Sequence, residues 1–561
     1  MAASSYGPVP TRPIGLLLLC VLAAAWILPG LIGHDPWKQD EAYTIGIVHS
    51  ILQGGDRVVP MLAHEPFMEK PPLFYLMAAG FAWLLSPPFS LHDAARLTSG
   101  LFMALTFLFV GGAARELFGT TRGTLAVLAL MSCLGLMVRS HQLITDIALL
   151  TGFAAALYGW ALALRRPAWG GFWLGLGTGL GFMTKGLLAP GVLGLTALAL
   201  LAFPTWRTRG YLTTLGVAVL AALPWLVAWP WALYSRSPDL FNEWLWVQNL
   251  GRFIGSDKLG PGDGAHYLRI LPWYSLPALP LALWALFRAR AAGLTAPPYA
   301  LPLTAFLVTL LVLSVSRDAR ELYALPLLLP LALLATPATE TLRRGAANFM
   351  YWFSVMGCGV LIIAAWFYWT ALELGYPPRL HAHLHRLQPG YAPGFKLLPF
   401  VLGLLYTAGW IALMVKLEKT RERPLLAWAA SMTVIWGLLG ILFVGWVDAG
   451  KSYRAMIADM QTALPAQYDC VASKNLGEPQ RALLHYFAGL VTWRMDAEGR
   501  QKDCQLVLVQ GVASEEYVPL GPWKKIWEGM RPGDKLERYR LYMRSDVKPV
   551  AVERGLKLQR K

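Results

Sequence analysis

Hydrophobic residues in this chain gather in long blocks that short polar stretches separate. Since a helix needs about 20 apolar residues to cross the hydrocarbon core of a bilayer, each long block predicts one membrane-spanning helix. By this length rule we expect about thirteen spans. They cover residues 13–32, 96–114, 123–138, 147–164, 169–184, 187–204, 211–234, 269–287, 299–315, 322–337, 347–371, 396–415 and 425–446.

One further apolar segment, residues 71–88, decides the topology. If it does not cross and the N-terminus is cytoplasmic, every short loop rich in Arg or Lys faces the cytoplasm, as the positive-inside rule requires. These residues are Arg115, Arg122, Arg165, Arg166, Arg207, Arg209, Arg288, Arg290, Arg343, Arg344, Lys416, Lys419, Arg421 and Arg423. We therefore predict that 71–88, entered through Pro71-Pro72, is an interfacial helix. The first span is expected to stay uncleaved, because no small-residue cleavage site follows it.

The composition changes after Trp446. Residues 447–561 are polar and contain several Gly and Pro turn signals, a buried-strand candidate at 506–509 and a helix candidate at 479–490. We predict a small soluble α/β domain there, on the non-cytoplasmic side. The transmembrane domain then covers 1–446 and includes two outer loops, 33–95 and 235–268.

Two cysteines, Cys470 and Cys504, lie in the soluble region. In an oxidising compartment they could form a disulfide, but proximity cannot be read from the sequence. A disulfide and two free thiols therefore both remain open.

Composition supports a polytopic α-helical membrane protein. Of the 561 residues, 56% are hydrophobic and 15% are charged, and the mean hydropathy is +0.46. The net charge of +16 is scattered over short loops rather than concentrated on one helix. We therefore expect no nucleic-acid partner, and attribute the charge to orientation in the membrane and to a phosphate-bearing lipid.

The predicted topology brings ionisable residues from distant loops to the same outer side. A charge at the bilayer centre costs at least about 2.5–3.5 kcal/mol, so such residues should lie at the interface and face a polar space. They are Asp40, Glu69, Asp146, Lys185, His266 and Arg320. We predict that one cavity collects them.

The most specific strings in the chain are Asp40-Glu41 and Glu69-Lys70-Pro71-Pro72. Together they resemble the first extracytoplasmic loop of polyprenyl-phosphate-sugar-dependent glycosyltransferases with the C-type fold, above all the bacterial lipid A aminoarabinose transferases and protein O-mannosyltransferases. Thr184-Lys185-Gly186 and Arg320-Glu321-Leu322-Tyr323 are similar to later strings of that family. The resemblance implies a bacterial inner-membrane enzyme with the C-type fold and a periplasmic active site.

The resemblance also implies roles for single residues. Asp40 would be the general base that deprotonates an acceptor, Glu41 would orient Asp40 or bind the sugar, and Asp146 would be a second catalytic carboxylate. Fixed cations would stabilise the leaving phosphate of the donor. The residues in question are Lys70, Lys185 and Arg320, together with Tyr323. Helix capping by Asp146 and interface anchoring by the cations are the competing interpretations.

A metal is a further implication of the resemblance. Some aminoarabinose transferases hold zinc between a Glu of the first loop and a His of a later loop, and the matching pair here is Glu69 and His266. Two protein ligands are fewer than a zinc site normally uses. His381, His383 and His385 would share one face of an extended segment, but an exposed loop accounts for them more simply than a metal site.

The expected activity is transfer of one hexose or pentose from polyprenyl (undecaprenyl) phosphate to lipid A, another glycolipid or a protein, with inversion. The aminoarabinose transferases continue the first motif with Pro-Arg-Tyr, whereas this chain continues with Ala42-Tyr43-Thr44. A transporter or flippase is disfavoured because no pair of matching halves is visible. An oligosaccharide polymerase or ligase shares the many spans, yet that class usually lacks the Asp-Glu and Glu-Lys-Pro-Pro strings.

Overall fold

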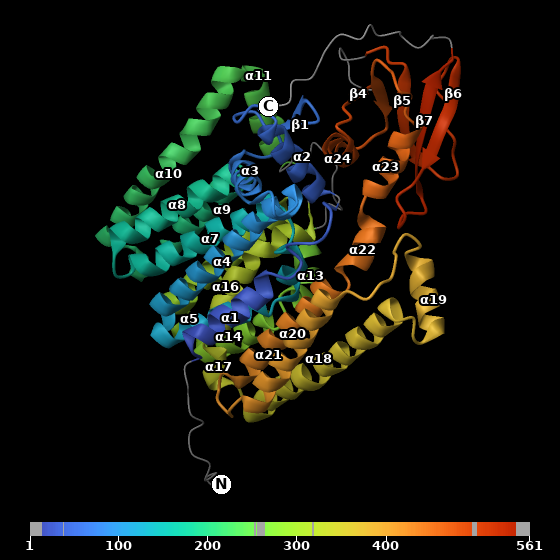
Figure 1. Cartoon of the computed structure of the whole chain (residues 1–561). Coiled ribbons are helices and arrows are strands. Elements are labelled where there is room, and N and C mark those ends of the chain that lie inside the picture. Colours follow the sequence, from blue (N-terminus) through green and yellow to red (C-terminus); the bar gives the residue numbers. More distant parts are fainter. Residues whose placement is uncertain are drawn as a thin grey trace.

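The structure is a computed structural model that describes residues 14–37, 39–251, 254, 264–316, 319–495 and 502–545. Figure 1 shows a large bundle of helices, with a small sheet standing at one end and joined to the bundle through α22 and α23. A helical membrane protein with a small C-terminal α/β unit was predicted, and this fold class is confirmed.

Seven helices of the described residues are long and apolar enough to span a membrane. An eighth span arises if α13 (His266–Tyr274) and α14 (Ala278–Leu294), which meet at 97°, count as one broken helix. The seven are α4 (Leu91–Phe118), α7 (Thr145–Ala163), α10 (Arg209–Arg236), α15 (Pro297–Val315), α18 (Arg344–Glu373), α20 (Leu397–Lys416) and α21 (Arg423–Leu442).

The other predicted spans coincide with helices that are shorter or rich in glycine. They are α1 (Leu16–Ile27), α5 (Gly123–Met131) with α6 (Leu134–Arg139), α8 (Pro167–Lys185), α9 (Leu188–Leu200) and α16 (Leu325–Ala335). The predicted interfacial segment forms α3 (Leu73–Leu85), which has 13 residues. At 1.5 Å per residue it covers about 20 Å, too little for a hydrocarbon core of about 30 Å.

Glycines allow α7, α8 and α10 to pack backbone to backbone. A Cβ atom on Gly152 of α7 would lie 2.7 Å from the carbonyl oxygen of Gly177 in α8. On the other side of α8, a Cβ on Gly175 would lie 2.3 Å from the carbonyl oxygen of Ala218 in α10. Such small-residue contacts hold helices together where the surrounding lipid offers no hydrophobic driving force. This rigid block carries the ends of α7 and α8 that reach the outer loops.

Short elements surround the predicted site at the end of the bundle that the topology prediction places outside, which we call the outer end. The first outer loop contains α2 (Asp40–Leu52) and the hairpin of β1 (Met61–Leu62) and β2 (Glu65–Pro66), which precede α3. A later outer loop contains α11 (Pro238–Asn242) and η3 (Glu243–Gly251). The remaining short helices are η1 (Thr120–Arg122), η2 (Pro204–Trp206), η4 (Glu321–Ala324) and α17 (Ala338–Thr341).

The C-terminal unit is a five-stranded mixed sheet in the order β4-β3-β5-β7-β6. The strands β3, β4 and β5 run parallel, and β7 runs antiparallel to β5 and β6. The predicted strand at 506–509 lies within β5, and the predicted helix at 479–490 forms α24 (Glu478–Ala488). The strands are β3 (Val471–Lys474), β4 (Thr492–Arg494), β5 (Leu506–Val512), β6 (Trp523–Gly529) and β7 (Glu537–Arg544).

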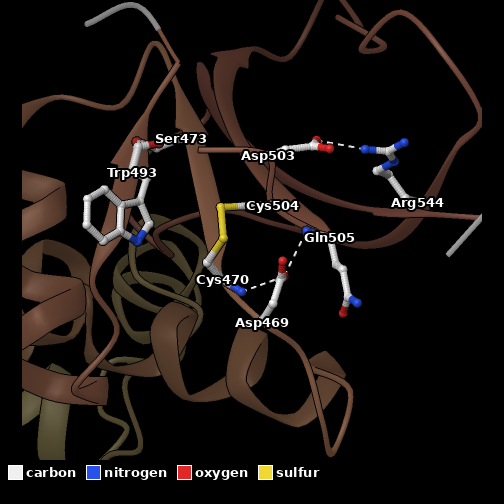
Figure 2. Close-up of a disulfide and its surroundings, with 8 residues drawn as sticks. All are labelled: Asp469, Cys470, Ser473, Trp493, Asp503, Cys504, Gln505 and Arg544. Carbon is white, nitrogen blue, oxygen red and sulfur yellow. Dashed lines mark hydrogen bonds and ion pairs between the residues drawn. A yellow bond between two sulfur atoms is a disulfide. The ribbon is translucent and has the colours of Figure 1, made fainter. Parts of the chain in front are cut away.

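Cys470 and Cys504 form a disulfide with a Cα–Cα distance of 5.0 Å, as Figure 2 shows. They directly precede β3 and β5, which pair in parallel, so the pairing brings the two cysteines together. Asp469 accepts hydrogen bonds from the backbone N–H groups of Cys470 and Gln505, at 2.5 and 2.9 Å. Of the two possibilities left open by the sequence, a disulfide and two free thiols, the structure has the disulfide.

The sheet unit packs against the helix that begins with Asp40. Gly46 of α2 faces Ala482 of α24 so closely that an added Cβ would lie 2.8 Å from the Cβ of Ala482. Beside this contact, Arg481 of α24 forms an ion pair of 2.9 Å with Glu65 of the first loop. The linking helices α22 (Val444–Lys451) and α23 (Arg454–Ala463) therefore end in a unit that braces α2.

The interpretation of His381, His383 and His385 as part of an exposed loop was wrong. These residues lie in α19 (Pro378–Leu387), which begins with a proline at its first turn. Leu380, Leu384 and Leu387 recur at helical spacing, and the first two of them pack on the bundle while Leu387 is exposed.

Candidate active site

The Asp40 carboxylate lies at the start of α2, where it contacts the ammonium group of Lys70. Lys70 Nζ donates to Asp40 Oδ1 at 3.3 Å and lies 3.8 Å from Glu69 Oε1. The Lys70 side chain is 7% exposed and the Asp40 side chain 26% exposed. The two strings of the first loop, about 30 residues apart in the sequence, thus form one ionic cluster.

The carboxylates keep Lys70 charged. Burial disfavours the ammonium form and by itself would lower the pKa of Lys70. The carboxylates of Glu69 and Asp40 outweigh this effect and raise the pKa of Lys70 well above its ordinary value. Lys70 is therefore a fixed positive charge near neutral pH.

Glu41, in contrast, is buried and fully engaged by the protein. Its Oε1 accepts from Arg96 Nε and from the backbone N–H of Leu143, both at 2.9 Å, and its Oε2 accepts from the N–H of Trp37 at 3.1 Å. Burial raises the pKa of Glu41, but the Arg96 guanidinium and further donors lower it below its ordinary value. Glu41 thereby ties the start of α2 to the loop that leads to Asp146.

A second ionic pair stands at the outer ends of α7 and α8. Lys185, the last residue of α8, lies 2.5 Å from Oδ1 of Asp146 in the first turn of α7. The Lys185 ammonium also lies 4.4 Å from the centre of the Tyr323 ring. Asp146 Oδ2 is buried and has no hydrogen-bond partner within the described part of the chain. A hydroxyl or amine donor of a substrate would satisfy this oxygen.

Gly186 explains the Thr-Lys-Gly string. It ends α8 with a φ of +67°, and the Asn249 Oδ1 atom lies 2.1 Å from the position that a Cβ would take. Asn249 accepts from the N–H of Leu187 at 3.1 Å and donates to the carbonyl of Trp244 at 2.8 Å. Only glycine combines this backbone conformation with so close a neighbour. The contact fastens η3 beside Lys185.

A cavity of about 330 Å³ lies where these elements meet. Glu69, Lys70, Lys185 and Tyr323 line one part of it, and Gln248, Asn249 and Ser316 add polar groups. Leucine and valine side chains of α9 and α15 form the remaining wall. The cavity thus combines two lysines with an apolar surface, which suits a phosphate attached to a hydrocarbon chain.

Of the six ionisable residues that were predicted to share one cavity, Glu69 and Lys185 line it, whereas Asp40, Asp146, His266 and Arg320 are not among its lining residues. Arg320 is half-buried directly before η4 and is not one of the residues that line this cavity. His266 begins α13, and its buried Nε2 has no hydrogen-bond partner among the described residues. That free nitrogen would suit a metal, yet the described residues contain no group of three or more His, Cys, Asp or Glu side chains placed to hold one. The described residues do not form a zinc site of ordinary composition.

The sequence prediction missed Arg96, which is fully buried at the outer end of α4. Besides Glu41, its guanidinium donates to Asp93 and to the carbonyls of Leu31 and His34. The signal was present, because His92, Asp93 and Arg96 interrupt the start of an apolar span. Arg96 contacts none of the residues that line the cavity, so its effect on the site runs through Glu41.

Comparisons with known proteins identify relatives of this chain. Residues 69–231 match the family model for dolichyl-phosphate-mannose-protein mannosyltransferase. The chain is 31% identical over 445 residues to undecaprenyl phosphate-alpha-4-amino-4-deoxy-L-arabinose arabinosyl transferase of Pseudomonas aeruginosa, covering 76% of this chain and 74% of that protein. It is 26% identical over 435 residues to the transferase of the same name from Serratia proteamaculans, covering 76% and 75% of the two chains.

A solved structure shares the fold. It is the crystal structure of ArnT from Cupriavidus metallidurans bound to undecaprenyl phosphate, which superposes with a TM-score of 0.69 at 16% sequence identity. The match covers 94% of this chain and 97% of that one.

Proposed function

The chain belongs to the family of undecaprenyl phosphate-aminoarabinose arabinosyl transferases, and on this premise we propose a reaction for it. It is an integral-membrane glycosyltransferase that takes a sugar from undecaprenyl phosphate and passes it to an acceptor. The proposed sugar is the pentose 4-amino-4-deoxy-L-arabinose, and the proposed acceptor is lipid A on the periplasmic side of the inner membrane. The observation that carries the proposal is the cavity in which two lysines and a carboxylate cluster face an apolar wall.

The donor would bind with its phosphate between Lys70 and Lys185 and with its prenyl chain along α9 and α15. Both lysines line the cavity, and the helices beside them supply apolar side chains. Tyr323 also lines the cavity, and the contact of its ring with the Lys185 ammonium would hold Lys185 in place. Arg320 precedes η4 and is not among the lining residues, so it would act from the edge of the site.

Asp40 would act as the general base. It accepts the proton of the acceptor's attacking O–H while that oxygen forms a bond to the anomeric carbon. The bond between the anomeric carbon and the phosphate oxygen breaks, and its electron pair leaves with undecaprenyl phosphate. This single displacement inverts the anomeric centre, and a phosphate leaving group needs no separate acid. Lys70 and Lys185 stabilise the charge that develops on the leaving phosphate.

Asp146 and Glu41 would act differently from Asp40. The unpartnered Asp146 Oδ2 would accept a hydrogen bond from the transferred sugar, for which an amine or hydroxyl is suited. Glu41 has both oxygens occupied by Arg96, Leu143 and Trp37, so we assign it a positioning role for Asp40. No step is assigned to a metal at Glu69 and His266.

Asp40→Asn tests this assignment most simply. Removal of a general base lowers the rate by about 10²–10⁴-fold, so transfer from undecaprenyl phosphate-linked sugar should nearly vanish in purified, reconstituted protein. Asp239→Asn is the matched control, because Asp239 is exposed on the outer helix α11 and should leave transfer unchanged. Full activity of Asp40→Asn would refute the assigned base.

The substrates require a separate experiment. Deletion of the gene followed by mass spectrometry of cell-envelope lipids and glycoproteins should reveal loss of one aminopentose from lipid A. Loss of a hexose would correct the sugar, and a change confined to glycoproteins would correct the acceptor. An unchanged envelope, when expression in the parent strain is verified, would contradict both substrate assignments.

A further inference from the structure

A second cavity lies away from the proposed active site, on the outside of the bundle. It measures about 610 Å³ and lies between α18 and α21, with α19 across one end. Its lining is almost wholly apolar and includes Leu361, Ala364, Ile435 and Leu438. We call this cavity the α18–α21 groove. Its walls are faces of two membrane-spanning helices, so it opens where lipid chains surround the protein.

The helix across the end of the groove, α19, contributes His383, Leu384 and Leu387 to its lining and carries two arginines beside it. His383 of α19 lines the groove, and Arg379 and Arg386 lie four residues before it and three residues after it. These spacings put the three side chains on one helical face. All three are exposed, while Leu384, on the adjoining side of the helix, is buried and lines the groove. The sequence of α19 contains no acidic residue.

Glu373, the acidic residue at the end of the preceding helix α18, has hydrogen-bond partners of its own. It accepts hydrogen bonds from the Tyr391 hydroxyl and from the backbone N–H of Gly394. It therefore closes the loop after α19 rather than neutralising the basic face. Positive charge next to an apolar groove at a membrane boundary is the pattern that attracts an anionic lipid headgroup.

The groove lies at the same end of the bundle as the proposed active site. Gly390, just after α19, lies close to Pro532 in the turn between β6 and β7, and Gly445 of α22 lies close to Tyr391. Figure 1 shows α19 beside α22, on the way from the bundle to the sheet. The basic face of α19 is thus at the outer-leaflet boundary of the proposed topology.

We propose that the α18–α21 groove is a binding site for an anionic glycerophospholipid of the outer leaflet. One acyl chain lies in the groove between α18 and α21, and the headgroup phosphate contacts Arg379, His383 and Arg386 of α19. This site is separate from the donor cavity, whose lining comes from other helices. By occupying the groove, the lipid fastens α19 and the loop that contacts α22 and the sheet unit.

The test uses the full-length protein in nanodiscs made from equal amounts of phosphatidylglycerol and phosphatidylcholine. After stepwise detergent extraction, native mass spectrometry counts the lipids that stay bound. We expect the last retained lipid to be phosphatidylglycerol with a preference of about tenfold, because two arginines near the surface each favour an anionic headgroup. Equal retention of the two lipids by the wild type would overturn the proposal.

Two variants locate the site. Arg379→Ala with Arg386→Ala should reduce the preference to about twofold or less, since the guanidiniums supply most of the attraction. Ala364→Trp, which fills the groove, should abolish retention of the last lipid whatever its headgroup. The matched control is Lys416→Ala with Lys419→Ala, which removes the same charge from two exposed positions. Lys416 is the last residue of α20 and Lys419 follows in the next loop.

The remaining outcomes also test the proposed lipid site. If the arginine and lysine variants lose the preference for phosphatidylglycerol equally, the preference depends on the net charge of the protein and not on α19. This result would overturn the proposed site. Retention of a phosphorylated glycolipid instead of phosphatidylglycerol, in protein purified from native membranes, would overturn the assigned occupant. If the arginine variant does not fold, the wild-type preference and the Ala364→Trp variant still decide the question.

Discussion

Two Lys–Asp pairs lie at the outer end of this bundle, and they differ in how tightly they are built. Lys70 lies in the first outer loop and Asp40 begins α2; the two are 3.3 Å apart, and Asp40 is 26% exposed. Lys185 and Asp146 stand at the ends of two glycine-packed helices, 2.5 Å apart, and Asp146 is 2% exposed. The carboxylate of the first pair is thus partly open to solvent, whereas that of the second is enclosed by the helices that carry it.

The difference follows from what supports each pair. The second pair rests on α7 and α8, whose backbones touch through Gly152 and Gly177. The first pair rests on α2, which is held from two sides. Arg96 binds Glu41 from within the bundle, and α24 of the sheet unit packs against Gly46.

The largest expected difference between the two pairs is in stability. Asp146→Asn leaves Lys185 as an uncompensated buried charge, and breaking a buried ion pair costs about 3–5 kcal/mol. Asp40→Asn leaves Lys70 with Glu69 still 3.8 Å away, so we expect a cost of about 1 kcal/mol or less. Denaturant unfolding of both variants in detergent, followed by tryptophan fluorescence, measures the gap. Equal destabilisation would contradict the contrast between the pairs.

Arg96→Met should disturb the Lys70–Asp40 pair and leave the Lys185–Asp146 pair in place, because Arg96 binds Glu41 at the start of α2. It leaves Glu41 buried without its cation, a change that again costs about 3–5 kcal/mol. Because Glu41 positions α2, kcat should fall while the KM for the donor stays near the wild-type value. Adding Glu41→Gln to Arg96→Met should restore part of the stability, since the buried charge is then gone. If KM for the donor rises and kcat stays constant, Glu41 contacts the substrate and does not position Asp40.

Loss of the disulfide should affect the Lys70–Asp40 pair and not the Lys185–Asp146 pair, because the sheet unit packs against α2, the helix that begins with Asp40. In the chain-entropy account, closing a loop of about 34 residues stabilises the folded unit by about 3–4 kcal/mol. Cys470→Ala with Cys504→Ala should therefore expose the sheet unit to limited proteolysis and reduce transfer, while undecaprenyl phosphate still binds. Cys358→Ala is the control, because this free cysteine lies in α18, far from the sheet. Unchanged proteolysis in the double variant would show that the sheet unit does not depend on the bridge.

A smaller effect is expected from pH at the contact between α2 and α24. His485 of α24 lies 5.0 Å from the ring of His49 in α2 and 5.1 Å from that of His64. Burial, together with the nearby His49 and His64, lowers the pKa of His485 to about 4. The neutral form is thus favoured in the docked unit, and the unfolded chain takes up protons first as the pH falls. Other titratable and charged groups at this contact include Tyr486 with His92, Glu65 with Arg481 and Arg494, and Tyr43 of α2 with Glu478 of α24.

Docking stability should therefore be complete above pH 6.5 and decline as the pH falls towards 4. Hydrogen exchange of α24 at pH 7.5 and pH 5 measures the change, with α7 as the internal reference. His485→Gln should flatten the dependence. A profile of α24 that is equally steep in His485→Gln would assign the effect to another group.

The comparison also shows what the sequence could and could not predict. The block pattern of apolar residues predicted helices at every span, because the length needed to cross a bilayer is fixed. The Glu-Lys-Pro-Pro string and the Thr-Lys-Gly string directed attention to Lys70 and Lys185, which line the same cavity. Arg96 was missed because it is the first residue of a predicted span, where a charged residue is expected at the membrane boundary and its burial cannot be read from the sequence.

Other features required three-dimensional information. Asp40 was predicted to be the base, and Glu41 to orient Asp40 or bind the sugar. Although the two are adjacent in the sequence, they contact different partners, Lys70 and Arg96. The extended geometry expected for His381, His383 and His385 was wrong because leucines at helical spacing form α19. The pairing of Cys470 with Cys504 depended on the parallel register of β3 and β5, which residue spacing does not encode.

Binding of undecaprenyl phosphate measures the central claim most directly, since that claim is a single cavity in which Lys70 and Lys185 hold the donor phosphate. The affinity of the reconstituted protein is compared for undecaprenyl phosphate and for undecaprenol, which shares the chain and lacks the phosphate. We predict that the wild type prefers the phosphate by at least about tenfold, and that Lys70→Ala and Lys185→Ala each remove most of that preference. Equal preference in the wild type and both variants would show that the phosphate binds elsewhere, and would contradict the account.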